Sequence, residues 1–286
     1  MDIVLAAEGE DLAVREAHEQ AWRRFQPLLD ELAGELPMLR QPVLAGGCPL
    51  RGEVARQMWR ACAAHRPLFV TPMAAVAGAV AQTLLAAYRR PGIRRAWVNN
   101  GGDIALQLAA GESLRIGLAA DPSRLDASAL AHAAQGRLDL QGQLRLHADD
   151  GVAGLATSGW GGRSHSLGIA DSVTVLAADA ASADAAATLL ANAVDAPHPA
   201  IHRRPACELL DDSDLGERLV TVAVPRLPAA LVEQALDAGL AQAQRLCAEG
   251  LVVAALLACQ GRVRAAGVGA LSPAIPDRSA TPALTP

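Results

Sequence analysis

Residues 73–88 are mostly Ala, Val, Gly and Leu, and they predict a helix with almost no large side chains. Such a helix can lie very close to a sheet or to a ligand. The whole chain has this character, because hydrophobic residues make up 51% of it and aromatic residues only 2%. The core must therefore be built from Ala, Leu and Val, and it must pack through close backbone approach rather than through aromatic stacking.

The order of the expected elements predicts an α+β fold. Helices and strands do not alternate strictly, as they would in a doubly wound sheet. Thr71 and Ser182 are suitable N-caps, and Pro27 can kink or break the first helix. Helices are predicted at residues 9–36, 53–64, 73–88, 182–194 and 228–249. Strands are predicted at residues 68–70, 95–108 (two pieces around Gly101 and Gly102), 114–119, 137–147, 152–156, 172–177 and 219–224, with a hairpin of 251–260 and 263–266 across Gly261 and Arg262.

The chain is predicted to contain one main domain. Residues 1–36 form an N-terminal helical segment, and residues 37–269 contain no clean linker. Residues 270–286 are rich in Pro, Ser, Thr and Ala, which predicts a disordered tail.

Charge and residue usage exclude several classes of function. A net charge of −5 argues against a nucleic-acid partner. All 25 basic residues are Arg, so a P-loop lysine and Schiff-base chemistry are excluded. The five cysteines include no Cys-x-x-Cys, which indicates reduced thiols. The N-terminus does not read as a signal peptide and no apolar run is long enough to span a bilayer, so we expect a cytoplasmic protein without a membrane partner.

Two segments combine glycines with polar side chains. Residues 99–103 read Asn-Asn-Gly-Gly-Asp, which is either a hairpin turn or a place where backbone approaches a ligand. Residues 157–166 combine hydroxyl groups and glycines with Arg163 and His165. Such a loop is either a solvated surface loop or a site for an anion, phosphate above all. Trp160 within it is either a stacking surface for a flat ring or a lid over the core.

Asp184 and Thr188 lie four residues apart near the start of a predicted helix, so they share one face. Carboxylate and hydroxyl oxygens suit a Mg²⁺ ion that keeps waters and substrate phosphates. Alternatively, the Asp only favours the helix N-terminus and the Thr bonds back to the previous turn. His198 and His202 are also four apart, but the prolines around them favour a polar loop over a metal site.

Taken in order, these segments resemble the ApbE-like proteins, whose best-known members are Mg²⁺-dependent flavin transferases. The resemblance is strongest to an uncharacterised branch of that superfamily and covers residues 40–268. It implies an α+β fold with sheets like those of the tunnelling fold, and a metal held by Asp184, Thr188 and a backbone carbonyl near Ala77. The segments that carry it are residues 71–81, 100–104, 157–159, 164–171, 173–175 and 183–189.

The resemblance also implies a ligand, FAD or FMN, and a possible Mg²⁺-dependent flavin transfer. Alternatives are an enzyme of pterin-type or one-carbon cofactor biosynthesis and a non-catalytic flavin-binding protein; a homo-oligomer is possible. The candidate residues are Thr71, Asn99, Asn100, Gly101, Gly102, Asp103, Thr157, Ser158, Gly159, Arg163, Ser164 and Ser166 for the ligand, His165 for catalysis, and Asp184 and Thr188 for the metal.

The chain departs from the transferase pattern near the phosphate region. The transferases usually carry Ala-Lys-Gly where residues 76–78 read Val-Ala-Gly. In the uncharacterised branch a His usually precedes the Ser, but here Arg163 precedes Ser164 and His165 follows it. We therefore expect ligand binding with weak or absent FMN transfer.

Overall fold

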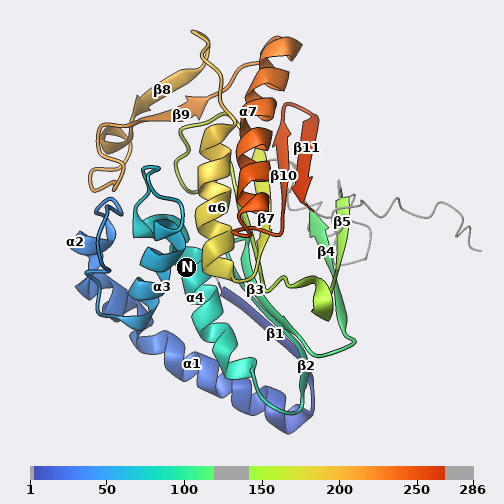
Figure 1. Ribbon diagram of the computed structural model, residues 1–286. Coiled ribbons are helices and arrows are strands. Elements are labelled where there is room, and N and C mark those ends of the chain that lie inside the picture. The colour runs from blue at the N-terminus through green and yellow to red at the C-terminus, as the bar shows by residue number, and fades with distance from the viewer. Residues whose placement is uncertain (1–2, 119–141, 268–286) are drawn as a thin grey trace, which may run out of the picture.

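The computed structural model describes residues 3–118 and 142–267, and it confirms the predicted α+β class (Figure 1). Its centre is a seven-stranded antiparallel sheet in the order β1-β2-β3-β6-β7-β10-β11, and two smaller sheets pair β4 with β5 and β8 with β9. The strands are β1 (Ile3–Gly9), β2 (Ile93–Asn100), β3 (Asp103–Leu108), β4 (Ser113–Leu118), β5 (Gly142–His147), β6 (Gly154–Ser158), β7 (Ser172–Ala177), β8 (His202–Pro205), β9 (Leu219–Ala223), β10 (Ala254–Cys259) and β11 (Arg262–Gly267).

Helices cover one face of the main sheet (Figure 1). The helix α4 packs on β2 and β3, α6 on β6 and β7, and α7 on β10 and β11. The helices are α1 (Asp11–Gly34), α2 (Leu36–Leu39), α3 (Glu53–Ala63), α4 (Val76–Leu85), α6 (Ala180–Ala193) and α7 (Ala229–Ala248), with short 3₁₀ turns at η1 (Pro72–Ala75), η2 (Ala86–Tyr88), η4 (Ala148–Asp150) and η5 (Ala206–Glu208). Among the described residues, no helix is long and apolar enough to cross a membrane.

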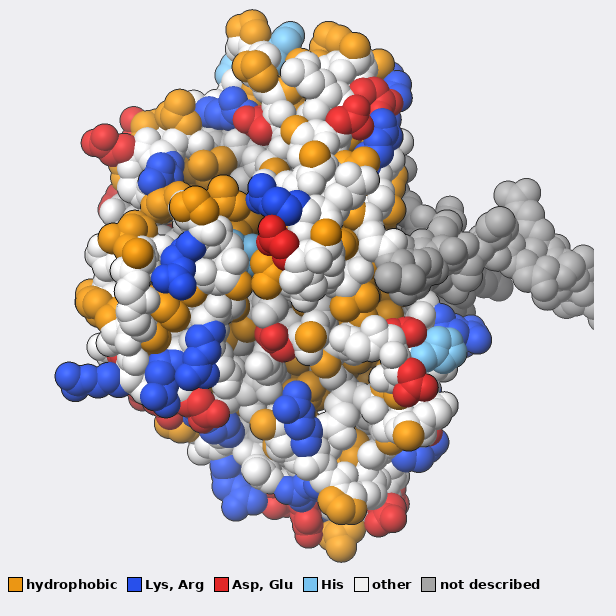
Figure 2. Space-filling model, in the orientation of Figure 1, with side chains coloured by type: hydrophobic (Ala, Val, Ile, Leu, Met, Phe, Trp, Pro, Cys, Tyr) orange, Lys and Arg blue, Asp and Glu red, His pale blue; other side chains and the backbone are white. Residues whose placement is uncertain are grey.

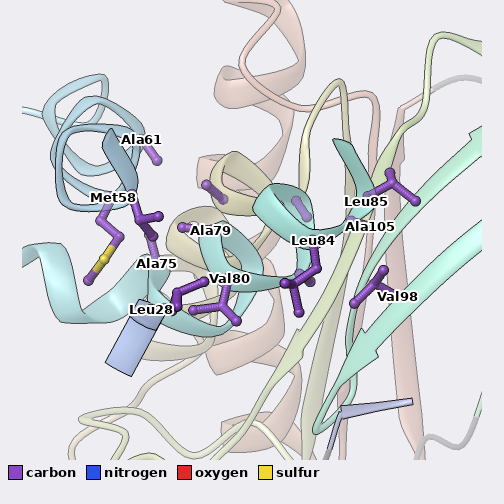
Figure 3. Packing of buried hydrophobic residues seen from close by; sticks show 14 of the residues in the cluster. Leu28, Met58, Ala61, Ala75, Ala79, Val80, Leu84, Leu85, Val98 and Ala105 are labelled. Atoms are coloured by element: carbon purple, nitrogen blue, oxygen red, sulfur yellow. The ribbon is translucent and has the colours of Figure 1, made fainter. Parts of the chain in front are cut away.

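The core on this face is made of small side chains, as the composition predicts. Figure 3 shows Ala79, Val80 and Leu84 of α4 between the other helices and Val98 and Ala105 of the sheet. Close backbone approach is most marked at α6. A Cβ added to Gly78 of α4 would lie 2.1 Å from the carbonyl oxygen of Ala180. A Cβ added to Gly154 of β6 would lie 2.3 Å from the backbone nitrogen of Ala180. Glycine at both positions lets α6 lie directly against α4 and β6.

The opposite face of the sheet is covered by the antiparallel pair β4–β5. Leu144 and Leu146 of β5 are buried against Leu106, Leu155 and Leu176 of the main sheet. The strand β7 lies between β6 and β10 and is buried along its whole length, because helices cover one of its faces and the β4–β5 pair covers the other.

Most of the predicted elements are present with small shifts of their ends. The segment 9–36 is helical through Pro27, which lies inside α1. The predicted strand at residues 68–70 is wrong, since this segment has no strand partner. Ser182 is not the cap of α6; Asp179 is, and its carboxylate accepts the Ser182 backbone N–H at 2.9 Å. Thr71 precedes η1 without capping it through its side chain.

Two strands were not predicted. The strand β1 is the edge strand of the main sheet beside β2. The strand β8 begins at His202, in the segment predicted as a polar loop, and it pairs with β9. The turn of the C-terminal hairpin is formed by Gln260 and Gly261, which both have positive φ. The strand β5 begins at Gly142, within the segment predicted as a strand at residues 137–147. The tail at 270–286 and residues 119–141 lie outside the described residues, and the division of the chain at residue 36 stays a prediction.

The surface carries both signs of charge. Figure 2 shows acidic side chains lying among the basic ones on the face viewed. Many of these groups pair locally, such as Arg24 with Glu31 and Arg90 with Glu16.

Candidate functional site

A cavity of about 350 Å³ opens at the end of the main sheet where β2 turns into β3 and where β6 ends. The start of α4 and one face of α6 form its other walls. The lining residues are Val76, Ala77, Asn100, Gly101, Asp103, Thr157, Ser158, Gly159, Gly162, Arg163, Ser164, Asp184 and Thr188. All three polar segments of the sequence therefore contribute to one cavity.

Strand alternation directs polar groups to the helix-covered face. Val98 and Ala105 belong to the core on that face, and residues two positions away along a strand share its side. Asn100 and Asp103 are paired across the hairpin and point the same way. The Asn100 amide donates to the carbonyl oxygen of Ala77 at 3.1 Å, which ties the end of β2 to the start of α4.

Asp184 of α6 reaches the first turn of α4. Its carboxylate accepts the Gly78 backbone N–H at 2.9 Å, so it satisfies one of the free amides at the α4 N-terminus. Thr188 lies one turn along α6 and lines the same cavity, as the four-residue spacing predicts. The Ala77 backbone N–H also interacts with the Asp184 carboxylate, so Asp184 is held by the first turn of α4 and also lines the cavity.

Asp103 lies in the same cavity, where its carboxylate accepts the Thr157 backbone N–H at 3.3 Å. Burial raises the pKa of Asp103 to about 6, although the Thr157 amide and the Arg163 charge oppose the rise. Burial, and then the charge of Asp103, raise the pKa of Asp184 well above its usual range. Neither carboxylate forms an ion pair with a described residue. Two acids so close together need a shared proton or a cation between them.

Arg163 connects the loop after β6 to the β2–β3 turn. Its Nη2 donates to the carbonyl oxygen of Gly101 at 3.0 Å. The turn is closed by Asn99, whose side-chain oxygen accepts the Gly102 backbone N–H at 2.8 Å. The two glycine-rich segments thus face the same cavity, with a guanidinium group at its mouth.

Five candidate ligand or catalytic residues do not line the cavity: Thr71, Asn99, Gly102, His165 and Ser166. The Thr71 hydroxyl donates to Asp214 on the β8–β9 connection. Ser166 is buried, and its hydroxyl donates to the Asn192 side chain at 3.1 Å. The indole N–H of Trp160 donates to Asp171 at 3.3 Å, and Trp160 is not a lining residue.

The closeness of Asp103 to Asp184 was missed by sequence reasoning. Asp103 reads as part of a turn and Asp184 as part of a helix, and nothing in the spacing relates them. Val76 also lines the cavity; it was not a candidate residue, although residues 76–78 stand where the transferases carry Ala-Lys-Gly. Gly162 lies in the glycine-rich loop already singled out.

The donor set fits a hard cation. The cavity offers two carboxylates and the Thr188 hydroxyl, and within residues 3–118 and 142–267 no group of three or more His, Cys, Asp or Glu side chains could hold a metal ion. Oxygen-only donors in small number suit Mg²⁺, which keeps several waters and takes further oxygens from bound phosphates. His198 is engaged within its loop, where its ring nitrogen accepts the Ala200 N–H at 3.2 Å.

Replacing Gly101 with Ala is expected to displace Arg163 and weaken ligand binding. Gly101 has φ +69°, and an added Cβ would lie 1.4 Å from Arg163 Nη2. The unfavourable φ costs about 1–2 kcal/mol in any case. Gly111→Ala is the matched control, because Gly111 has φ +80° with nothing within 4 Å of the added Cβ. Titration calorimetry should show weaker ligand binding for Gly101→Ala only; equal affinity in both variants would remove Arg163 from the site.

Comparison with known proteins gives the family. Residues 1–265 match the family described as "AbpE bacteria". Relatives named "UPF0280 protein" occur in Methanopyrus kandleri (39% identity over 175 residues, 59% of this chain and 62% of the relative), Methanothermobacter thermautotrophicus (36% over 173 residues, 60% and 59%) and Methanosarcina acetivorans (30% over 195 residues, 68% and 70%).

The chain spans about three-fifths of the length of the first two of these relatives, and neither name states an activity. The family match itself covers almost the whole described chain, including every residue that lines the cavity. The protein belongs to the AbpE bacteria family and is similar to archaeal UPF0280 proteins.

Proposed function

We propose that this protein binds a phosphate-bearing heterocyclic ligand, a flavin nucleotide first, through a Mg²⁺ ion held in the cavity. One observation carries the proposal: Asp103 and Asp184 share one cavity with glycine-rich backbone and Arg163, and neither carboxylate forms an ion pair within the described part of the chain. A divalent cation would balance both charges and attract phosphate oxygens.

The lining of the cavity supports recognition of a charged group. Only Val76 and Ala77 of its lining residues are apolar, and none is aromatic. The hydroxyls of Ser158 and Ser164 and the guanidinium group of Arg163 are suited to phosphate oxygens.

A bound Mg²⁺ would offset charge on a diphosphate as it is cleaved. In that complex Asp184 and Thr188 would hold the ion, and Arg163 would orient the phosphate oxygens. Transfer also needs a base near the acceptor hydroxyl. His165 does not line the cavity, so none of the predicted catalytic groups lies where such a base is needed.

The proposal is tested by titrating FAD and FMN into the purified protein with Mg²⁺ and again with EDTA. We expect binding in Mg²⁺ and at least about tenfold weaker binding in EDTA, the scale on which metal-site changes act. Equal affinity in both buffers would contradict the role of the cation. Binding of a pterin but of no flavin would favour the alternative of pterin-type or one-carbon chemistry.

Transfer of FMN to an ApbE acceptor peptide is expected to be weak or absent. The first turn of α4 has no lysine for the phosphates, and His165 lies outside the cavity lining. Release of AMP from FAD, followed by chromatography with and without the peptide, measures the reaction. Stoichiometric, Mg²⁺-dependent AMP release with labelled peptide would show that these departures do not prevent transfer.

Cation binding is expected to tighten as the pH rises. Because the pKa of Asp103 is raised to about 6, the folded protein holds a proton there that the unfolded chain has already lost between about pH 4 and pH 6, and the raised pKa of Asp184 acts in the same direction. Without a cation, the free energy of unfolding should therefore fall as the pH rises through this window.

Mg²⁺ binds only the ionised pair, so the Mg²⁺-induced rise in Tm should be larger at about pH 7 than at about pH 5. The positive charge of Arg163 opposes the rise in the pKa of Asp103, and Asp184 is the other acidic group that interacts with Asp103. Thermal unfolding in Mg²⁺ and in EDTA at both pH values measures the effect. A Mg²⁺-induced rise that is the same at both would contradict the involvement of the pair.

A further inference from the structure

Asp103 lines the same cavity as Asp184 and Thr188. It begins β3, and its side chain points to the helix-covered face together with Asn100. One carboxylate oxygen, Oδ1, accepts the Thr157 N–H at 3.3 Å. The other oxygen accepts no hydrogen bond from the residues that the structure describes. The carboxylate is thus fixed at one atom and free at the other, in the cavity that Asp184 also lines.

We infer that Asp103 is a second carboxylate ligand of the cation, and that the cavity takes up a divalent cation before any phosphate-bearing ligand arrives. The inference rests on the proposed function, in which Asp184 and Thr188 hold the ion and Asp103 contributes only its charge. With Asp103 included, the protein supplies two negative charges and one hydroxyl from two elements, the β2–β3 turn and α6.

The charge balance around the cavity favours a divalent ion. Arg163 is the only cationic side chain among the described lining residues, and its Nη2 is engaged with the Gly101 carbonyl. The two carboxylates together match the charge of Mg²⁺ or Mn²⁺. Ca²⁺ takes six to eight oxygens, whereas Mg²⁺ is often held by one or two carboxylates with waters completing the shell.

A cation shared by Asp103 and Asp184 would also fix the ligand-facing turn. Asp103 directly follows Gly101 and Gly102, and Gly101 accepts the hydrogen bond from Arg163. Holding Asp103 against α6 would therefore set the position of both the turn and the guanidinium group. The cation would prepare the cavity for phosphate as well as contact it.

The experiment measures Mn²⁺ binding to the protein without nucleotide, by the loss of the free-ion electron paramagnetic resonance signal. Asp103→Asn is the main variant, since its Oδ1 can still accept the Thr157 N–H. Asp30→Asn is the control for total charge, because Asp30 is exposed on α1 and no residue of α1 lines the cavity. We expect wild type and the control to bind alike, and Asp103→Asn to bind at least about tenfold more weakly.

Asp103→Glu keeps the charge and should retain more Mn²⁺ affinity than the Asn variant if both fold, which circular dichroism establishes. Wild-type affinity in Asp103→Asn, or no Mn²⁺ binding by wild type without nucleotide, would overturn the inference. In either case a parallel FAD titration in Mg²⁺ and EDTA still decides the proposed function, so the two failures are distinguishable.

Discussion

Asp184→Asn is expected to abolish Mg²⁺-dependent ligand binding while leaving the fold intact. Asparagine has nearly the same shape, and its Oδ1 can accept the Gly78 N–H that the carboxylate now accepts. It removes the negative charge, which is what a cation needs, and it ends the repulsion from Asp103. The expected loss of affinity is at least about a hundredfold, the upper end of the range for groups that support a metal. Titration of FAD in Mg²⁺ measures it.

Asp184→Ala separates the two roles of this residue. Alanine removes the charge and also leaves the Gly78 N–H without its partner, so it should destabilise the start of α4 by about 0.5–2 kcal/mol, as loss of a helix cap does. If Asp184 only caps α4, the Asn variant should bind ligand like wild type, and only the Ala variant should lose stability. That outcome would remove Asp184 from the site and leave it a structural residue.

Gly78→Ala is expected to cause the largest loss of stability of any single methyl addition considered. The added Cβ would lie 2.1 Å from the Ala180 carbonyl oxygen, and backbone cannot rotate away as a side chain can. Separating α4 from α6 should cost about 1–3 kcal/mol or more. At roughly 2–4 °C per kcal/mol, Tm should fall by several degrees. Separation would also draw the Gly78 N–H away from Asp184 and weaken cation binding.

Gly34→Ala is the matched control. Gly34 is the last residue of α1, and an added Cβ meets nothing within 4 Å. This change should be neutral or stabilising by up to about 1 kcal/mol, because alanine is the better helix former. Thermal unfolding of the two variants beside wild type gives the comparison. A Tm for Gly78→Ala equal to that of Gly34→Ala would mean that the helices can separate at little cost.

The sequence predicts those parts of the site that depend on local spacing. Asp184 and Thr188 share a face because they are four residues apart, and the Gly101-Gly102 turn follows from glycine flanked by alternating strands. The close contact of α4 with α6 follows from small side chains, although the sequence does not say that Ala180 is the partner of Gly78.

The rest depends on tertiary contacts that no local pattern contains. Asp103 meets Asp184 only because β3 and α6 pack at one end of the sheet. Residues 68–70 have strand composition, but Arg218 Cζ lies 3.4 Å from the centre of the Phe69 ring and none of the described strands pairs with this segment. The hydroxyl groups of Thr71 and Ser166 donate hydrogen bonds to Asp214 and Asn192, so these polar groups stabilise the fold. A polar loop in the sequence does not by itself show whether its side chains stabilise the fold or bind a ligand.

The most direct measurement is an anomalous difference map from crystals grown with MnCl₂ and FAD, collected at the manganese absorption edge. The account predicts one strong peak in the cavity, within bonding distance of Asp184 and Thr188, and diphosphate density next to it. A peak that also lies within bonding distance of Asp103 would support the second carboxylate ligand. Flavin density in the cavity without a manganese peak, or manganese bound away from α6, would contradict the cation-dependent site.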